Sequence, residues 1–137
     1  MPGRETPRIL IADNDEEVLI ALEHILETGG YATATALCPQ EAAKLLGQAR
    51  FDLCVIDDCF SDKDCISALT EFKTRRTMPL VIVTYHQFPV HEQETQLRAL
   101  GVSAFVNKRA HTELVEIVAE LLQPVRWKSR DPLHEIT

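Results

Sequence analysis

Short apolar runs alternate with helix-periodic segments along most of this chain, and that alternation constrains the fold more than any other feature. Runs such as Arg8–Ala12 and Leu53–Ile56 have the length and composition of buried strands. Between them apolar residues recur every three or four positions, as from Val18 to Leu26, which predicts amphipathic helices. A strand–helix unit repeated five times implies a parallel sheet with helices on both faces.

The same pattern predicts the positions of the elements and the extent of the domain. The predicted strands are Arg8–Ala12, Tyr31–Ala36, Leu53–Ile56, Leu80–Val83 and Val102–Asn107. Helices are expected from Pro39 to about Gly47 and from Glu92 to Leu100, with another over the apolar stripe Leu114–Leu122. We therefore expect one domain over residues 8–123, an extension at 1–7, and a tail or the start of a linker at 124–137.

Composition narrows the classes of function. The formal net charge of -7 argues against direct nucleic-acid binding, which needs a basic surface. No apolar run approaches the roughly 20 residues of a membrane helix, and the first residues lack the apolar core of a signal peptide, so a cytoplasmic protein without membrane contact is expected. The four cysteines form no CxxC pair, so we expect them to be reduced, with Cys54 inside a strand.

Polar side chains follow four of the five predicted strands. In an open sheet of parallel strands, such residues meet at the carboxyl edge, where ligands bind. They are Asp13, Asn14 and Asp15 after the first strand, Asp57 and Asp58 after the third, Thr84 after the fourth and Lys108 after the fifth.

The chemistry of this set favours phosphoryl transfer. Two carboxylates ~5 Å apart repel by roughly 3 kcal/mol at an effective dielectric constant near 20, so the acids call for a cation. Oxygen ligands select Mg²⁺, and a carboxylate can accept a phosphoryl group. A lysine and a hydroxyl can stabilise the charge on the transferred group. Each residue alone has an ordinary explanation, such as a helix N-cap for Asp15.

Four motifs give the chain a family resemblance. ILIADNDEEV, DLCVIDD, PLVIVTYH and SAFVNK resemble the first, third, fourth and fifth strands of the receiver domain of two-component response regulators. The similarity extends from about Arg8 to Gln123. It implies the flavodoxin-like (βα)5 three-layer fold with a five-stranded sheet of order 2-1-3-4-5.

The resemblance also implies roles for individual residues. Asp57 matches the phosphoacceptor. The implied ligands of Mg²⁺ (or Mn²⁺) are Asp13, Asn14, Asp57 and the backbone carbonyl of Cys59. Thr84 and Lys108 match the phosphate-stabilising pair, and Phe105 matches the aromatic switch. Cys59 and His86 stand where the family tunes dephosphorylation, although His86 is as readily explained by simple exposure to solvent.

The implied function is that of a signalling module. A histidine kinase or phosphotransfer protein would donate the phosphoryl group. The domain would have no enzymatic activity beyond self-phosphorylation from a phosphodonor and autodephosphorylation. A surface formed by the fourth helix, fifth strand and fifth helix would respond, and two copies could pair through it. The downstream partner or output domain stays unnamed.

The chain departs from the family pattern at several positions. Asn14 replaces an acidic metal ligand, so weaker metal binding is expected, although Asp15 could compensate in part. Arg109 stands where the family has proline after the lysine, so this peptide bond is either trans or strained. Asp58 replaces an apolar residue, while Ser61 and Cys65 replace proline and glycine.

These departures leave two alternatives. In the first, the chain is a pseudo-receiver that binds proteins without being phosphorylated, which Asn14 and Arg109 favour. In the second, it is a haloacid-dehalogenase-like phosphohydrolase with Asp13 as nucleophile and Asp15 as acid/base. In those enzymes the final acidic pair follows the lysine, whereas Asp57 and Asp58 precede it here.

Overall fold

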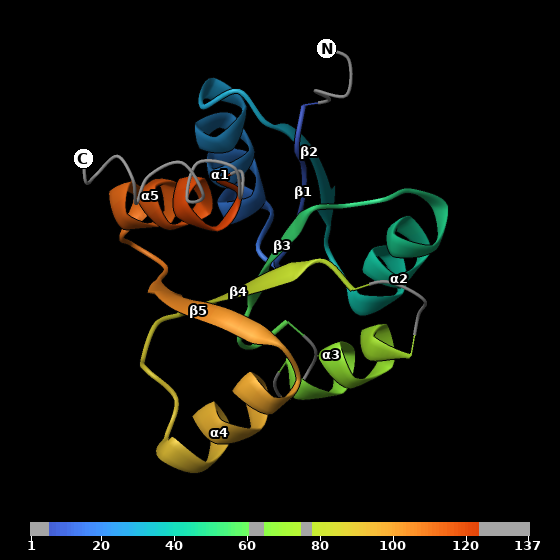
Figure 1. The fold of residues 1–137 in the computed structure, drawn as a ribbon, viewed down its shortest axis with the longest axis vertical. Helices are drawn as coiled ribbons and strands as arrows, with labels where there is room; N and C mark the ends of the chain where they lie inside the picture. Colours follow the sequence, from blue (N-terminus) through green and yellow to red (C-terminus); the bar gives the residue numbers. More distant parts are fainter. Residues whose placement is uncertain (1–5, 61–64, 75–77, 124–137) are drawn as a thin grey trace, which may run out of the picture.

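Five parallel strands form the centre of the fold, in the order β2-β1-β3-β4-β5, which confirms the predicted fold class (Figure 1). The computed structural model describes residues 6–60, 65–74 and 78–123. The strands are β1 (Arg8–Ala12), β2 (Ala32–Ala36), β3 (Leu53–Asp57), β4 (Leu80–Tyr85) and β5 (Val102–Asn107). The helices are α1 (Glu16–Thr28), α2 (Pro39–Gln48), α3 (Ile66–Lys73), α4 (His91–Ala99) and α5 (His111–Leu121).

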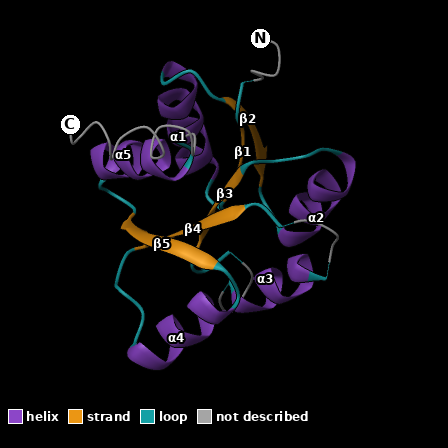
Figure 2. Cartoon of the chain, in the orientation of Figure 1, coloured by secondary structure: helices purple, strands orange, loops and turns teal. Residues whose placement is uncertain are grey.

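The helices lie on both faces of the sheet and enclose two apolar cores. Figure 2 shows α1 and α5 together on one face and α2, α3 and α4 on the other. Alternate residues of the central strands point into each layer because successive side chains of a strand face opposite sides. Leu10, Cys54 and Ile56 pack toward the three-helix face, whereas Ile9, Leu53 and Val55 pack toward α1 and α5.

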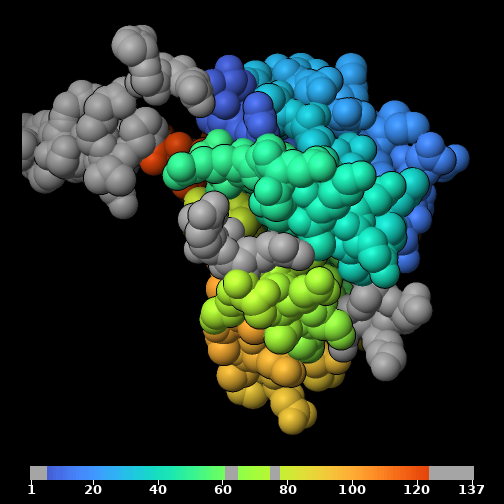
Figure 3. All heavy atoms as spheres, turned by 90° about the vertical axis from the view of Figure 1, so that its right-hand side faces the viewer, coloured from blue at the N-terminus to red at the C-terminus, as the bar shows by residue number. Residues whose placement is uncertain are grey.

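Helices α3 and α4 lie next to each other at one end of the three-helix face (Figure 3). They are joined by Lys73, whose Nζ donates to the carbonyl of Ala99 at 3.4 Å. Phe72 is 1% exposed and Leu97 is 3% exposed, and both belong to the core cluster beneath. Cys54 is buried in this core, as predicted, and burial raises the pKa of its thiol to about 12.

Two strands extend past their predicted ends. Asp57 is the last residue of β3, and Thr84 lies inside β4, opposite Asp57 in the ladder. The polar side chains suggested that the strands had ended, but ladder hydrogen bonds are made by the backbone, so pairing continues through them. At the other elements the differences are small: β2 begins at Ala32 and α4 covers His91–Ala99.

Strand β5 contains a bulge that the sequence did not predict. Val81 pairs with Val102, but the next residue, Ile82, pairs with Ala104, so Ser103 is an extra residue. Because of this extra residue, Val102 and Phe105 pack on the same core, which a regular strand would not allow.

The helices differ in how they begin. Helix α1 has Asp15 as N-cap, whose side chain accepts from the backbone N–H of Glu17. The cap positions of α3, α4 and α5 are Cys65, Val90 and Ala110, and none of these makes a side-chain capping bond. Among the described residues, none of the helices has the length and apolar composition of a transmembrane span.

Candidate functional site

Three charged side chains meet at the carboxyl edge of the sheet. The Nζ of Lys108 lies 2.9 Å from Oδ2 of Asp13 and 2.9 Å from Oδ1 of Asp57. The two aspartates are 1% and 4% exposed. They come from β1 and β3, which are neighbours in the sheet, and Lys108 follows β5. The structure thus brings together three residues that the sequence placed at separate strand ends.

The single ammonium group of Lys108 contacts two buried carboxylates, so the cluster carries a net negative charge. Apart from Lys108, the described residues provide no hydrogen-bond partner for Oδ2 of Asp13 or Oδ1 of Asp57. The other oxygens accept backbone N–H groups, from Asp15 at 2.9 Å and from Cys59 at 3.3 Å. A second cation would therefore be favourable at this edge.

Burial and charge perturb the acid–base properties of the cluster. Burial raises the pKa of Asp13, although its bond to Lys108 opposes this. Burial by itself would lower the pKa of Lys108, but the bonds to Asp13 and Asp57 outweigh it and raise this pKa above the ordinary 10.5. The lysine consequently stays protonated over the physiological pH range.

The two residues that follow Asp57 have raised pKa values as well. Burial, followed by the charge of Asp57, raises the pKa of Asp58, which is half-buried. Burial and the nearby charges of Asp58 and Asp57 raise the pKa of the Cys59 thiol. Since the thiolate is the reactive form, this thiol is poorly suited to redox or nucleophilic chemistry.

The predicted metal ligands lie close together, with one carboxylate fewer than the family pattern. The Nδ2 of Asn14 lies 3.5 Å from the carbonyl oxygen of Cys59, and the N–H of Cys59 bonds to Asp57. The expected metal ligands would all bind through oxygen atoms, which suits Mg²⁺. However, no group of three or more His, Cys, Asp or Glu side chains in the described residues is placed to hold a metal ion, and Asp15 caps α1 instead of completing the set.

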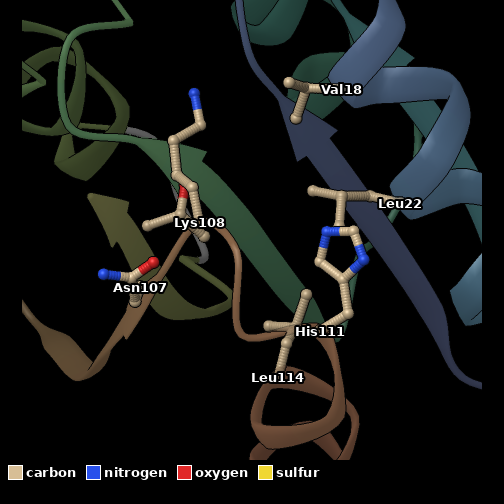
Figure 4. A pocket seen from close by; sticks show the side chains of 7 residues that line it. Val18, Leu22, Asn107, Lys108, His111 and Leu114 are labelled. Carbon is tan, nitrogen blue, oxygen red and sulfur yellow. The ribbon is translucent and has the colours of Figure 1, made fainter. Parts of the chain in front are cut away.

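Thr84 lies opposite Asp57 in the ladder between β3 and β4 and is 3% exposed. Its backbone carbonyl accepts the N–H of Asp58 at 2.9 Å. It helps line a cavity of about 10 Å³ between α1 and α5, which is room for about one water molecule. Figure 4 shows Asn107 and Lys108 on one side of this cavity, with His111 next to Leu22 of α1 on the other.

Phe105 belongs to an aromatic group that sequence reasoning did not identify. The Phe105 ring is half-buried, with the guanidinium carbon of Arg98 at 4.8 Å from its centroid. Phe88 lies between Phe105 and Tyr85, at centroid distances of 5.5 and 5.2 Å. Phe88 carried no periodic signal because it lies in the loop before α4. His86, in the same loop, is exposed.

A groove of about 110 Å³ begins at the two residues after Asp57. It is lined by Asp58, Cys59, Pro89, Gln93 and other residues. Cys65 also lines it and is 1% exposed, so it belongs to the core beneath. Ser61 lies outside the described residues.

The turn after β5 resolves the open question about Arg109. No peptide bond in the described residues is cis, so the Lys108–Arg109 bond is trans. The N–H of Lys108 donates to the carbonyl of Tyr85 at 2.8 Å, and the N–H of Arg109 donates to Oδ1 of Asn107 at 2.9 Å. The backbone carbonyl of Asn107 accepts the N–H of Ala110, also at 2.9 Å. Sequence reasoning gave Asn107 no role.

Solved structures show the same fold. A CheY-like response regulator receiver domain from Methanospirillum hungatei superposes with a TM-score of 0.77 at 24% identity, covering 85% of this chain and 93% of its own. A two-component response regulator from Clostridium difficile gives a TM-score of 0.78 at 19% identity, covering 88% and 98%.

Sequence relatives are longer proteins. The transcriptional regulatory protein PrrA of Mycobacterium tuberculosis is 30% identical over 121 residues, which are 88% of this chain and 52% of PrrA. The alginate biosynthesis transcriptional regulatory protein AlgB of Pseudomonas aeruginosa is 34% identical over 80 residues, which are 58% of this chain and 18% of AlgB. The chain thus spans about half the length of PrrA and less of AlgB.

A match to a family model shows which protein family the chain belongs to. The model of the response regulator receiver domain matches residues 9–119, which include every strand-end residue of the charged cluster. The match covers most of the chain and agrees with the sheet order and the solved structures. This chain therefore belongs to the response regulator receiver domain family.

Proposed function

We propose that Asp57 accepts a phosphoryl group from a phosphohistidine of a histidine kinase or phosphotransfer protein. The observation that carries this proposal is the contact of Lys108 with both Asp57 and Asp13, at 2.9 Å each. A buried carboxylate beside a fixed cation, at the ligand-binding edge of the sheet, is suited to accept and retain a charged group. The family is one of signalling modules, and we propose no turnover of a separate substrate.

In the proposed step, an oxygen of Asp57 bonds to phosphorus while the bond from phosphorus to the histidine nitrogen breaks. Lys108 neutralises charge on the phosphoryl oxygens, and the Thr84 hydroxyl, on the adjacent strand, donates to one of them. When bound, Mg²⁺ would supply further positive charge on these oxygens. Asp13, Asp57, Asn14 through its amide oxygen, and the carbonyl of Cys59 would hold it.

The proposed output is a change in the surface of α4, β5 and α5. Movement of Thr84 toward the phosphoryl group would be coupled to a reorientation of Phe105, the ring of which contacts Arg98 and Phe88. This surface would bind a downstream protein or a second copy of the chain in the cytoplasm. Cys59, two residues after Asp57, and His86, two residues after Thr84, would influence how long the phosphoryl group survives.

A pseudo-receiver remains the second candidate, and one contact favours it. The amide of Asn14 is placed to donate to the carbonyl of Cys59, which the metal would otherwise use. The phosphohydrolase alternative has no comparable support, because Asp15 caps α1 and the chain belongs to the receiver family.

Intact-mass measurement after incubation with acetyl phosphate or phosphoramidate and Mg²⁺ tests the proposal. We expect a gain of one phosphoryl group that is lost in Asp57→Ala and in the presence of a chelator. Asp58→Asn is the matched control, since it removes the neighbouring acid and should still gain the group. No gain with either donor would favour the pseudo-receiver, and labelling of Asp58 would contradict the assignment to Asp57.

A further inference from the structure

The turn that carries Lys108 is fixed by hydrogen bonds on both sides of the lysine. On the amino side, the N–H of Lys108 donates to the carbonyl of Tyr85 at 2.8 Å. On the carboxyl side, the N–H of Arg109 donates to Oδ1 of Asn107 at 2.9 Å. The acceptor must be the amide oxygen, because the NH₂ group of an asparagine cannot accept from an N–H.

This second bond depends on a departure from the family pattern. The family has proline after the lysine, and proline has no backbone N–H to donate. With Arg109 at that position, the donor exists, and Asn107 forms the side-chain-to-backbone turn that asparagine favours. The neighbouring Ala110 provides no side-chain cap for α5, so Asn107 supplies the side-chain contact at this turn.

We propose that Asn107 is a positioning residue for Lys108 and does in this chain what a proline-restricted turn does in the family. Its amide oxygen fixes the backbone on the carboxyl side of the lysine, so that the ammonium is directed at Asp13 and Asp57 together. Without the bond, the turn gains freedom and the lysine spends less time at the 2.9 Å contacts. The effect on phosphorylation rests on the function proposed for Asp57.

Two readouts separate this proposal from the proposed function. The first needs no phosphorylation: NMR follows hydrogen exchange of the Arg109 amide and the ¹⁵Nζ signal of the Lys108 ammonium, which is visible when ion pairing slows its exchange. The second is the rate of phosphorylation by acetyl phosphate with Mg²⁺. Asn107→Ala should speed exchange at the Arg109 amide, weaken the Lys108 signal and slow phosphorylation about three- to tenfold.

Companion variants distinguish positioning from general destabilisation. Asn107→Asp keeps an oxygen acceptor and should restore both the Lys108 signal and the rate. Ser103→Ala, at the exposed bulge residue of the same strand, should change neither. In an Arg109→Pro background the N–H is absent, so adding Asn107→Ala should change the rate less than twofold. If Arg109→Pro fails to fold, the Asn107→Asp rescue decides instead.

Two results for the Asn107 variants would overturn the proposal. An unchanged Lys108 signal in Asn107→Ala, with exchange at Arg109 accelerated, would show that the turn does not position the lysine. Equal slowing by Asn107→Ala and Asn107→Asp would also overturn it. If the wild-type protein takes no phosphoryl group, the proposed function fails, and the NMR readouts alone decide the role of Asn107.

Discussion

Asp58 places a charge directly beside the proposed acceptor, where the family pattern has an apolar residue. Its pKa is raised above the ordinary 3.8, first by burial and then by the charge of Asp57. A raised pKa in the folded state means that folding favours the protonated form. The ionised side chain therefore costs stability, and this cost begins above pH 3.8 and is complete once the pH exceeds the raised folded-state value.

We accordingly expect Asp58→Asn to stabilise the protein at pH 7 by about 0.5–1 kcal/mol, since the group is only half-buried and solvent screens it. The gain should shrink as the pH falls and vanish below pH 3.8. Urea unfolding at a series of pH values measures it. Glu116→Gln, at an exposed position of α5, should change the unfolding free energy little at any pH. A gain from Asp58→Asn that did not depend on pH would contradict the electrostatic explanation.

At the scale of the elements, the turn between α4 and β5 depends on the backbone of a single residue. Gly101 has φ = 107°, in the region that favours glycine, and an added Cβ would meet nothing within 4 Å. Gly47, inside α2, also has open space where a Cβ would lie, but its φ is not positive. The two glycines therefore differ in backbone conformation and not in crowding.

This pair gives a matched test. Gly101→Ala should lower the free energy of unfolding by about 1–2 kcal/mol because the left-handed conformation is strained for alanine. Gly47→Ala should raise it by about 0.5–1 kcal/mol because alanine is the better helix former. Chemical denaturation of the two variants and the wild type measures both effects. If both substitutions shifted stability in the same direction, the backbone argument would be wrong.

At the scale of the whole molecule, the two cores share the central strands. Strands β1, β3 and β4 contribute side chains to both clusters, whereas the edge strand β2 is half-buried except at Ala36. A strand that is covered on both faces and paired on both sides opens only with the rest of the protein.

Native-state hydrogen exchange should reveal this hierarchy. Amides of β1, β3 and β4 should exchange slowest, and amides of β2 at least about tenfold faster, which corresponds to ~1.4 kcal/mol in opening free energy. NMR-detected exchange on the whole chain provides the measurement, and the central strands serve as the internal reference. Uniform protection across all five strands would contradict this expectation.

The apolar pattern predicted a parallel sheet covered by helices on both faces, whereas the strand order 2-1-3-4-5 was predicted from the resemblance to receiver domains. The strand-end pattern also predicted that Asp13, Asp57 and Lys108 would meet, since the carboxyl ends of parallel strands share one edge. The roles given to Asp57 and Thr84 rest on the resemblance and stay predictions. Sequence reasoning did not identify Phe88, Arg98 or Asn107. Their importance depends on tertiary contacts and on one backbone donor, which have no periodic or compositional signal. Strand ends were likewise missed because a polar side chain does not interrupt a backbone ladder.

The bulge at Ser103 sets a rule for recombining this domain with its relatives. A chimera that exchanges only the second half of β5 keeps the phase of the strand if the crossover lies beyond the extra residue. A regular donor segment aligned residue for residue, with no gap at Ser103, would place the side chain at position 105 in the α1–α5 core and the side chain at position 106 toward α4. Sequence alignment alone would score the two chimeras almost equally, yet they would place different side chains on the surface from which the domain is expected to signal.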